Sequence, residues 1–155
     1  MGWNFSVLHL APPAAHLVEL GEERFVDADS EVDAWARASA AGLTIVSRSI
    51  FDTDAVEELA TKTHARIVMA VFSSVASTYL LDVYETGNRI RRIIKTEDAP
   101  ADGDGAPLPE EAHPDVINAP YDEDKYAALL AATGRFDIRV IDPGLFRRVL
   151  SPTLV

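Results

Sequence analysis

The sequence contains no cysteine, so it can form neither a disulfide bond nor a zinc–thiolate site, and it offers no thiol nucleophile. It also contains no apolar run that approaches the roughly 18 residues needed by a membrane-spanning helix. Its first residues, Met1 to Phe5, lack the basic region that begins a signal peptide. Together these absences favour a cytoplasmic protein that does not cross a membrane.

Basic residues, and lysines above all, are scarce. The 155 residues include only Lys62, Lys95 and Lys125, and the formal net charge is −11. Because proteins hold nucleic acids largely through Lys and Arg side chains that neutralise phosphates, this balance argues against a nucleic-acid partner. A basic protein is the partner that such a charge favours. The preference for Ala, Asp and Arg over Lys is typical of GC-rich bacterial coding sequences.

Motifs of catalysis and ligand binding are absent too. There is no H-E-x-x-H, G-x-S-x-G, G-x-G-x-x-G or P-loop motif. Residues 102–105 (DGDG) resemble the start of a calcium-binding loop, but position 106 is Ala where such a loop needs another ligand. The sequence therefore predicts no metal or cofactor and favours a protein without catalytic activity. No two histidines have the i, i+4 spacing of a zinc protease, so we interpret all four as structural: His9, His16, His64 and His113.

What the sequence does contain is a strongly acidic segment, residues 97–124. It holds ten acidic residues and five of the nine prolines but no Lys or Arg, whereas the rest of the chain has 15 acidic and 14 basic residues. We predict an acidic, proline-interrupted loop within a single domain that spans residues 1–155. The carboxylates that we expect to contact a basic partner are Asp102, Asp104, Glu110 and Glu111.

Hydrophobic periodicity predicts the elements around the acidic segment. The expected strands cover residues 3–10, 43–50, 66–72, 78–85 and 88–95, the last two forming a hairpin around Thr86-Gly87. A helix is expected from an N-cap at Ser30 to Gly42, and a second follows a cap at 52–54. After the acidic segment we expect a helix over 126–134, a short strand over 136–141 and a last helix that begins at Asp142-Pro143.

The order of these elements is β-α-β-α-β-β-β, followed by the acidic loop and the C-terminal helices. It predicts an α/β fold, with α+β as the alternative. The strand over 66–72 (RIVMAVF) begins an apolar run typical of a strand covered on both faces, so we place it at the centre of the sheet. Crossover helices imply parallel pairs among the first strands, and the hairpin adds antiparallel ones. We therefore predict one mixed sheet of about five strands with helices packed on it.

Two arginines of the hairpin, Arg91 and Arg92, are expected to face opposite sides of the sheet. At least one of them should be buried, and a buried guanidinium needs a carboxylate partner. Glu110 and Glu111 follow the flexible part of the acidic loop, so we predict that they clamp the loop onto the sheet.

The stretch from Ser74 to Glu110 resembles uncharacterised small α/β domains of actinobacteria that share a loose pattern. In that pattern a Ser opens a strand, a Gly turn is followed four residues later by Arg, and a loop closes with G-x-P-x-x-E. The matching residues here are Ser74, Gly87, Arg91, Gly105 and Glu110. In size, acidity and α+β make-up the chain is also similar to immunity-type proteins, which neutralise toxins. The resemblance implies no reaction, and it implies that Arg91 and Glu110 form a scaffold pair.

Three functions agree with these observations. The first is a non-catalytic, immunity-like interaction module that contacts a basic protein through its acidic loop. The second is an enzyme or small-molecule binder with a pocket where the strand 66–72 ends, since α/β folds often place ligands at strand ends. That pocket would be lined by Ser74, Ser77, Tyr79 and Arg91, although the serines also fit a simple bend. The third is a structural subunit of a homo-oligomer.

Overall fold

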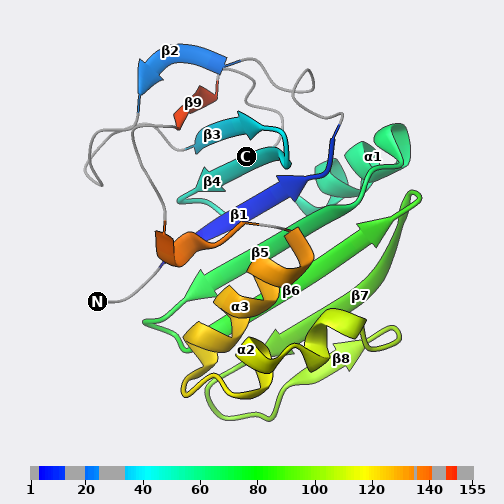
Figure 1. Ribbon diagram of the computed structural model, residues 1–155, viewed down its shortest axis with the longest axis vertical. Coiled ribbons are helices and arrows are strands. Elements are labelled where there is room, and N and C mark those ends of the chain that lie inside the picture. The colour runs from blue at the N-terminus through cyan, green and yellow to red at the C-terminus, as the bar shows by residue number, and fades with distance from the viewer. Residues whose placement is uncertain (1–3, 13–19, 25–33, 135, 141–145, 150–155) are drawn as a thin grey trace.

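The computed structural model of the chain describes residues 4–12, 20–24, 34–134, 136–140 and 146–149 (Figure 1). Within these ranges, hydrogen bonds join nine strands into one sheet, in the order β2-β9-β3-β4-β1-β5-β6-β7-β8. Each pair of neighbouring strands in this order is antiparallel. Because helices pack against an antiparallel sheet, the fold is of the α+β class.

Seven strands of five to eight residues form the body of the sheet. They are β1 (Asn4–Leu10), β2 (Leu20–Arg24), β3 (Ala34–Ser39), β4 (Gly42–Ser47), β5 (Ile67–Ser73), β6 (Thr78–Glu85) and β7 (Asn88–Lys95). Two strands of three residues complete it: β8 (Asp102–Asp104) at one edge, and β9 (Arg147–Val149) between β2 and β3.

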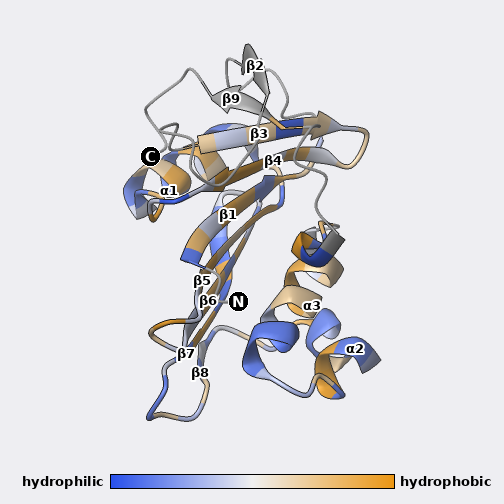
Figure 2. Ribbon diagram, turned by 90° about the vertical axis from the view of Figure 1, so that its left-hand side faces the viewer, coloured by the Kyte–Doolittle hydropathy of each residue, from blue (hydrophilic) through white to orange (hydrophobic). Residues whose placement is uncertain are grey.

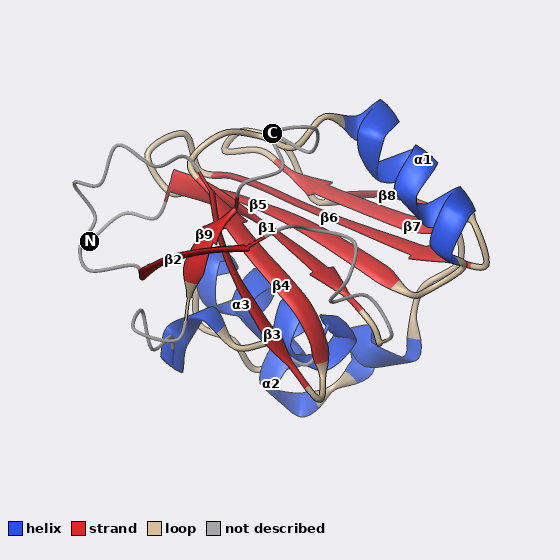
Figure 3. Ribbon diagram, turned by 90° about the horizontal axis from the view of Figure 1, so that it is seen from above, coloured by secondary structure: helices blue, strands red, loops and turns tan. Residues whose placement is uncertain are grey.

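Helices lie on both faces of the sheet. Helix α1 (Thr53–Thr63) lies on one face, and α2 (Pro114–Ile117) and α3 (Asp122–Gly134) lie on the other, as Figures 2 and 3 show. Two short 3₁₀ turns, η2 (Pro109–Ala112) and η3 (Ile138–Val140), flank α2 and α3 in the chain. None of the described helices is long and apolar enough to cross a membrane.

Strand β5 contributes to a hydrophobic core on each face. Ile67 and Met69 belong to the buried cluster beneath α1, whereas Val68, Ala70 and Phe72 belong to the cluster beneath α3. Successive strand residues point to opposite faces, so a strand covered on both sides must be apolar throughout. The prediction that residues 66–72 form a strand covered on both faces is therefore confirmed, and β5 lies beside β1, the middle strand of the sheet, instead of at its centre.

Local sequence signals also place the hairpin and two helices correctly. The Asp52 carboxylate accepts a hydrogen bond of 3.0 Å from the Asp54 N–H and caps α1. Thr86 and Gly87 join β6 to β7 with φ angles of 50° and 87°, the positive values that two-residue hairpin turns of this kind require. Helix α3 ends at Gly134, as predicted.

The predicted helix over 30–42 is wrong where the structure describes this range. Residues 34–39 form β3 and pair with β4 as an antiparallel hairpin. Ala34 and Ala36 are buried in the core beneath α1, whereas Trp35 is buried in the core beneath α3. Successive residues therefore point to opposite faces of the sheet, as in any strand. The sequence did not reveal this pattern because the residues on both faces are apolar and rich in Ala. The expected cap at Ser30 lies outside the described residues.

The predicted mixed sheet and C-terminal elements also need correction. The sheet has nine described strands and not about five, and all their pairings are antiparallel. The β3–β4 hairpin removes one expected crossover helix, and β1 lies between β4 and β5, so the two strands joined by α1 do not pair with one another. Residues 138–140 form a 3₁₀ turn instead of a strand. Residues 147–149 form strand β9, which pairs with β3 and β2, instead of the last helix. Asp142 and Pro143, the expected start of that helix, lie outside the described residues.

Candidate functional site

The acidic segment is ordered against the sheet and contains secondary structure of its own. It includes β8, η2 and α2, and α3 begins inside it. Strand β8 pairs with β7, with Asp104 opposite Arg92 and Asp102 opposite Ile94. Gly105 follows with a φ of 87°, and a Cβ at this position would lie 2.1 Å from the carbonyl oxygen of Ile90. A glycine is therefore needed where the segment meets β7.

Ion pairs of Glu110 and Glu111 with two arginines fasten the acidic segment to the sheet. Arg91 donates to both carboxylate oxygens of Glu111, from Nε at 3.0 Å and from Nη2 at 2.8 Å. Arg66 Nη2 lies 2.9 Å from Oε1 of Glu110. The sequence predicted that Glu110 and Glu111 act as clamps, and the geometry agrees, but the implied pair of Arg91 with Glu110 is wrong. Glu111 holds Arg91, and Glu110 reaches Arg66.

The Arg91 guanidinium connects three parts of this region. Its Nη1 donates to the carbonyl of Gly105 at 2.8 Å, while the other nitrogens bind Glu111. Burial raises the pKa of Glu111, but hydrogen bonds from Arg91 and from the Leu108 N–H, together with the Arg91 charge, leave it below its ordinary value of 4.5. Glu111 is therefore ionised at neutral pH and maintains its ion pair with Arg91.

The four carboxylates predicted to contact a partner fall into two groups. Asp102 and Asp104 on β8 are exposed. The side chains of Glu110 and Glu111 are only 22% and 21% exposed because they turn toward arginines. The first pair is thus open to solvent, with Asp104 80% exposed and 3.7 Å from Arg89 Nη2, whereas the second pair anchors the segment.

The residues of the predicted ligand pocket are only partly brought together. Ser74 Oγ donates to Glu123 at 2.8 Å, and the Tyr79 ring stacks on Tyr126 with 5.3 Å between ring centroids. Ser77 has a φ of 47° in the turn between β5 and β6, where its N–H donates to the Ser74 carbonyl.

Arg91 lies apart from this group. Tyr79 is the cross-strand partner of Lys95 on β7, and Arg91 is four residues from Lys95 in that strand. At about 3.3 Å per residue, the backbone of Arg91 is roughly 13 Å from the Tyr79–Lys95 pair along the strand direction. A small pocket of about 160 Å³ does form beside Arg91, and its lining includes Asp102, Glu111 and Lys125.

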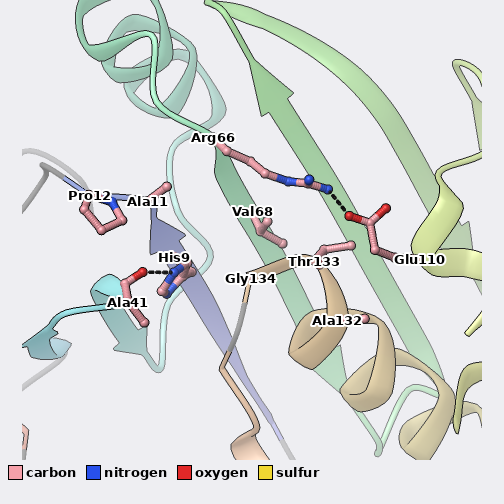
Figure 4. A pocket seen from close by; sticks show the side chains of 10 residues that line it. All are labelled: His9, Ala11, Pro12, Ala41, Arg66, Val68, Glu110, Ala132, Thr133 and Gly134. Atoms are coloured by element: carbon pink, nitrogen blue, oxygen red, sulfur yellow. Dashed lines mark hydrogen bonds and ion pairs between the residues drawn. The ribbon is translucent and has the colours of Figure 1, made fainter.

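A larger pocket lies at the other end of α3, and Figure 4 shows the side chains that line it. We call it the His9 pocket. Its volume is about 320 Å³. It lies between the end of β1, the start of β5, the C-terminal end of α3 and turn η2. Its lining residues are His9, Ala11, Pro12, Ala41, Arg66, Val68, Glu110, Ala132, Thr133 and Gly134.

His9 is a buried part of this wall and uses both ring nitrogens. Nδ1 lies 2.8 Å from the Thr44 hydroxyl, and Nε2 lies 3.1 Å from the Ala41 carbonyl oxygen. A carbonyl oxygen only accepts hydrogen bonds, so Nε2 donates to it. The histidine therefore ties β1 to β4 and to the turn between β3 and β4, which agrees with its interpretation as structural.

The Arg66–Glu110 ion pair supplies the charged part of the pocket wall. Arg66 Nη1 also lies 3.3 Å from Glu85, so this guanidinium has two carboxylate neighbours. Nε of Arg66 and Oε2 of Glu110 are nevertheless buried and form no hydrogen bond with any described residue. These two atoms flank the 2.9 Å contact and are covered by surrounding protein atoms, so they are not exposed to the open volume of the pocket.

The His9 pocket was not predicted from the sequence, although His9 and Glu110 were each singled out there. Arg66 begins the run 66–72 that was predicted as a strand, and Thr133 lies in the helix predicted over 126–134. No motif joins residues 9, 66, 110 and 133, because the pocket exists only through the packing of α3 and η2 on the sheet. Within the described residues, no group of three or more His, Asp or Glu side chains is arranged to hold a metal ion.

Comparison of this chain with protein-family models, with curated proteins and with solved structures returns no significant match.

Proposed function

We propose that this chain is a non-catalytic, immunity-like protein-interaction module that binds a basic protein partner through its acidic segment. The observation that carries the proposal is the placement of Asp102 and Asp104 on edge strand β8. Both carboxylates are exposed, and pairing with β7 fixes their backbone. The acidic segment adds further exposed carboxylates and no basic side chain: Glu97, Asp98, Asp115 and Asp122.

The anchoring of the acidic segment supports this role. Glu110 and Glu111 hold the segment to Arg66 and Arg91, so the exposed carboxylates are already positioned before a partner arrives. Prior ordering lowers the entropy that binding must offset. A concentrated negative surface also accelerates encounter with a positively charged protein and selects against acidic ones.

The experiment combines affinity capture with matched charge removal. The chain is used as bait in a bacterial lysate, the captured protein is purified, and its dissociation constant is measured at 50 and 300 mM salt. We expect a basic partner whose affinity falls at least about tenfold with salt, because screening weakens exposed charge pairs. The double variant Asp102→Asn/Asp104→Asn should weaken binding by a similar factor.

The matched control removes two exposed carboxylates from the other face, as Glu57→Gln/Glu58→Gln on α1. It should leave the affinity within about twofold of the wild type, since only rim charges near the partner contribute strongly. A partner whose binding ignores salt and both double variants would contradict the proposal.

A further inference from the structure

Strand β8 and the residue after it contain two Asp-Gly sequences, Asp102-Gly103 and Asp104-Gly105, on an exposed edge of the sheet. They form the DGDG motif, which lacks the third ligand of a calcium-binding loop because position 106 is Ala. An Asp followed by Gly has a chemical reactivity of its own, because glycine has no side chain to shield its amide nitrogen. That nitrogen can attack the carboxyl carbon of the aspartate and close a five-membered ring.

The structure places one of these carboxyl groups beside the nitrogen that would attack it. The Gly103 N–H donates a hydrogen bond of 2.9 Å to Oδ1 of Asp102, its neighbour in the chain. The carboxyl carbon is bonded to this oxygen, so it already lies close to the Gly103 nitrogen. Both residues are exposed, so water reaches the carboxyl group. Holding two reacting groups close together favours the reaction between them.

The second Asp-Gly sequence has a different geometry. An oxygen of the Asp104 carboxylate lies 3.7 Å from Nη2 of Arg89 on the neighbouring strand β7. The carbonyl of Gly105 accepts a hydrogen bond of 2.8 Å from Arg91, and a Cβ on Gly105 would lie 2.1 Å from the Ile90 carbonyl oxygen. Contacts with β7 therefore hold the backbone at Gly105 and restrict the rotation that ring closure needs.

We propose that Asp102 is a site of spontaneous isomerisation to isoaspartate. In the first step the Gly103 nitrogen bonds to Cγ of Asp102. The carboxyl group gives up its OH and the nitrogen its hydrogen, and these leave together as one water, so that a cyclic succinimide remains. Water then opens the ring. Opening at Cγ restores aspartate, whereas opening at the former main-chain carbonyl carbon leaves the chain running through Cγ, which is isoaspartate with the mass of aspartate.

Isomerisation alters the edge of the sheet. An isoaspartate adds one carbon atom to the main chain, and β8 has only three residues. The added atom disturbs the register in which Asp102 lies opposite Ile94 and Asp104 lies opposite Arg92. It also attaches the carboxylate of residue 102 directly to Cα. The exposed carboxylate surface of β8 therefore changes as the protein ages, and this chemistry does not depend on the protein partner proposed above.

Incubation of the purified protein at 37 °C and pH 6 for four weeks tests the proposal. Trypsin then releases residues 96–125 as one peptide, because no Lys or Arg lies between Lys95 and Lys125. Mass spectrometry with electron-transfer fragmentation locates isoaspartate in this peptide, and the succinimide appears as a form lighter by one water. We expect isoaspartate at residue 102 to be at least about fivefold more abundant than at residue 104.

Two comparisons show whether the folded geometry is the cause. In the free tryptic peptide, incubated in the same way, the two Asp-Gly sequences should react within about twofold of each other, because the contacts with β7 are gone. Asp102→Glu should give no product at residue 102, since a six-membered ring closes far more slowly, whereas Asp104→Glu should leave the reaction of Asp102 unchanged. Far-UV circular dichroism confirms that both variants are folded. The proposal fails if the folded protein forms no isoaspartate at residue 102, if residue 104 reacts equally, or if the free peptide shows the same preference.

Discussion

At the scale of single residues, buried charged side chains form ion pairs. One pair joins two neighbouring strands, and another joins the sheet to the acidic segment. Arg92 binds the carboxylate of Asp82 through two hydrogen bonds of 2.7 and 2.6 Å, and the Asp82 side chain is fully buried. The neighbouring Arg91 points to the opposite face and binds Glu111. Adjacent residues of one strand thus place positive charge on both sides of the sheet, and each charge meets a carboxylate.

The first prediction concerns the buried pair. Arg92→Met should lower the free energy of unfolding by about 3–5 kcal/mol, because it leaves the Asp82 carboxylate buried without its counter-ion. Arg89→Met is the control on the same strand, since Arg89 lies 3.7 Å from Asp104, which is 80% exposed. It should cost less than about 1 kcal/mol. Urea unfolding measures both, and equal losses would show that burial of Asp82 is not the cause.

The second prediction concerns pH. The folded-state pKa of Glu111 lies below its ordinary value of 4.5, so the stability it contributes is present above pH 4.5 and is lost as pH falls through the folded-state value. At pH 7, Glu111→Gln should be less stable than the wild type by about 1–3 kcal/mol. This difference should shrink below pH 4.5. Glu97→Gln, at an exposed position, serves as the control. A difference that stays constant with pH would rule out the Arg91 contact as its source.

At the scale of elements, the sequence predicted those whose signals are local. Helix α1 has its cap at Asp52, and the β6–β7 hairpin has its turn at Thr86-Gly87. Strand β3 was missed because Ala34 to Ala36 are apolar on both faces, so alternation gives no contrast in polarity. Strand β9 was missed because its partner Trp35 lies far away in sequence. The His9 pocket depends on the same kind of distant contact.

The third prediction concerns the turn of the β6–β7 hairpin. Thr86 adopts a φ of 50°, which is costly for a β-branched residue. Thr86→Asn should raise the free energy of unfolding by roughly 0.5–1 kcal/mol, because Asn tolerates this region and Asn-Gly suits the turn. Thr96→Asn is the control at another exposed threonine, and it should change stability little. Thermal unfolding compares the two, and a destabilised Thr86→Asn variant would refute the argument.

At the scale of the whole molecule, charge is strongly segregated. The acidic segment holds ten carboxylates without a basic residue, while the remainder has 15 acidic and 14 basic residues. The negative charge is therefore concentrated along the β8 edge and on α2 and the start of α3, on the side that Figure 1 shows at the bottom. Such segregation should govern how copies of the chain meet one another as well as how a partner approaches.

The fourth prediction follows from this charge. At pH 7.5 and low salt we expect the protein to remain monomeric, because a net charge of −11 opposes self-association. Near pH 4.6, its calculated isoelectric point, association should appear in light scattering. Circular dichroism at the same pH separates association from unfolding. A fixed oligomer at pH 7.5 that survives dilution would instead favour the homo-oligomeric subunit.

The position of β9 has a consequence for biosynthesis. Residues 147–149 lie between β2 and β3 in the sheet, although both of these strands precede them in the chain. While the ribosome extends the polypeptide, the outer side of β3 has no strand to pair with until this late stretch leaves the exit tunnel. A nascent chain that stalls before Arg147 would expose an open backbone edge, which is a template for aggregation with other chains.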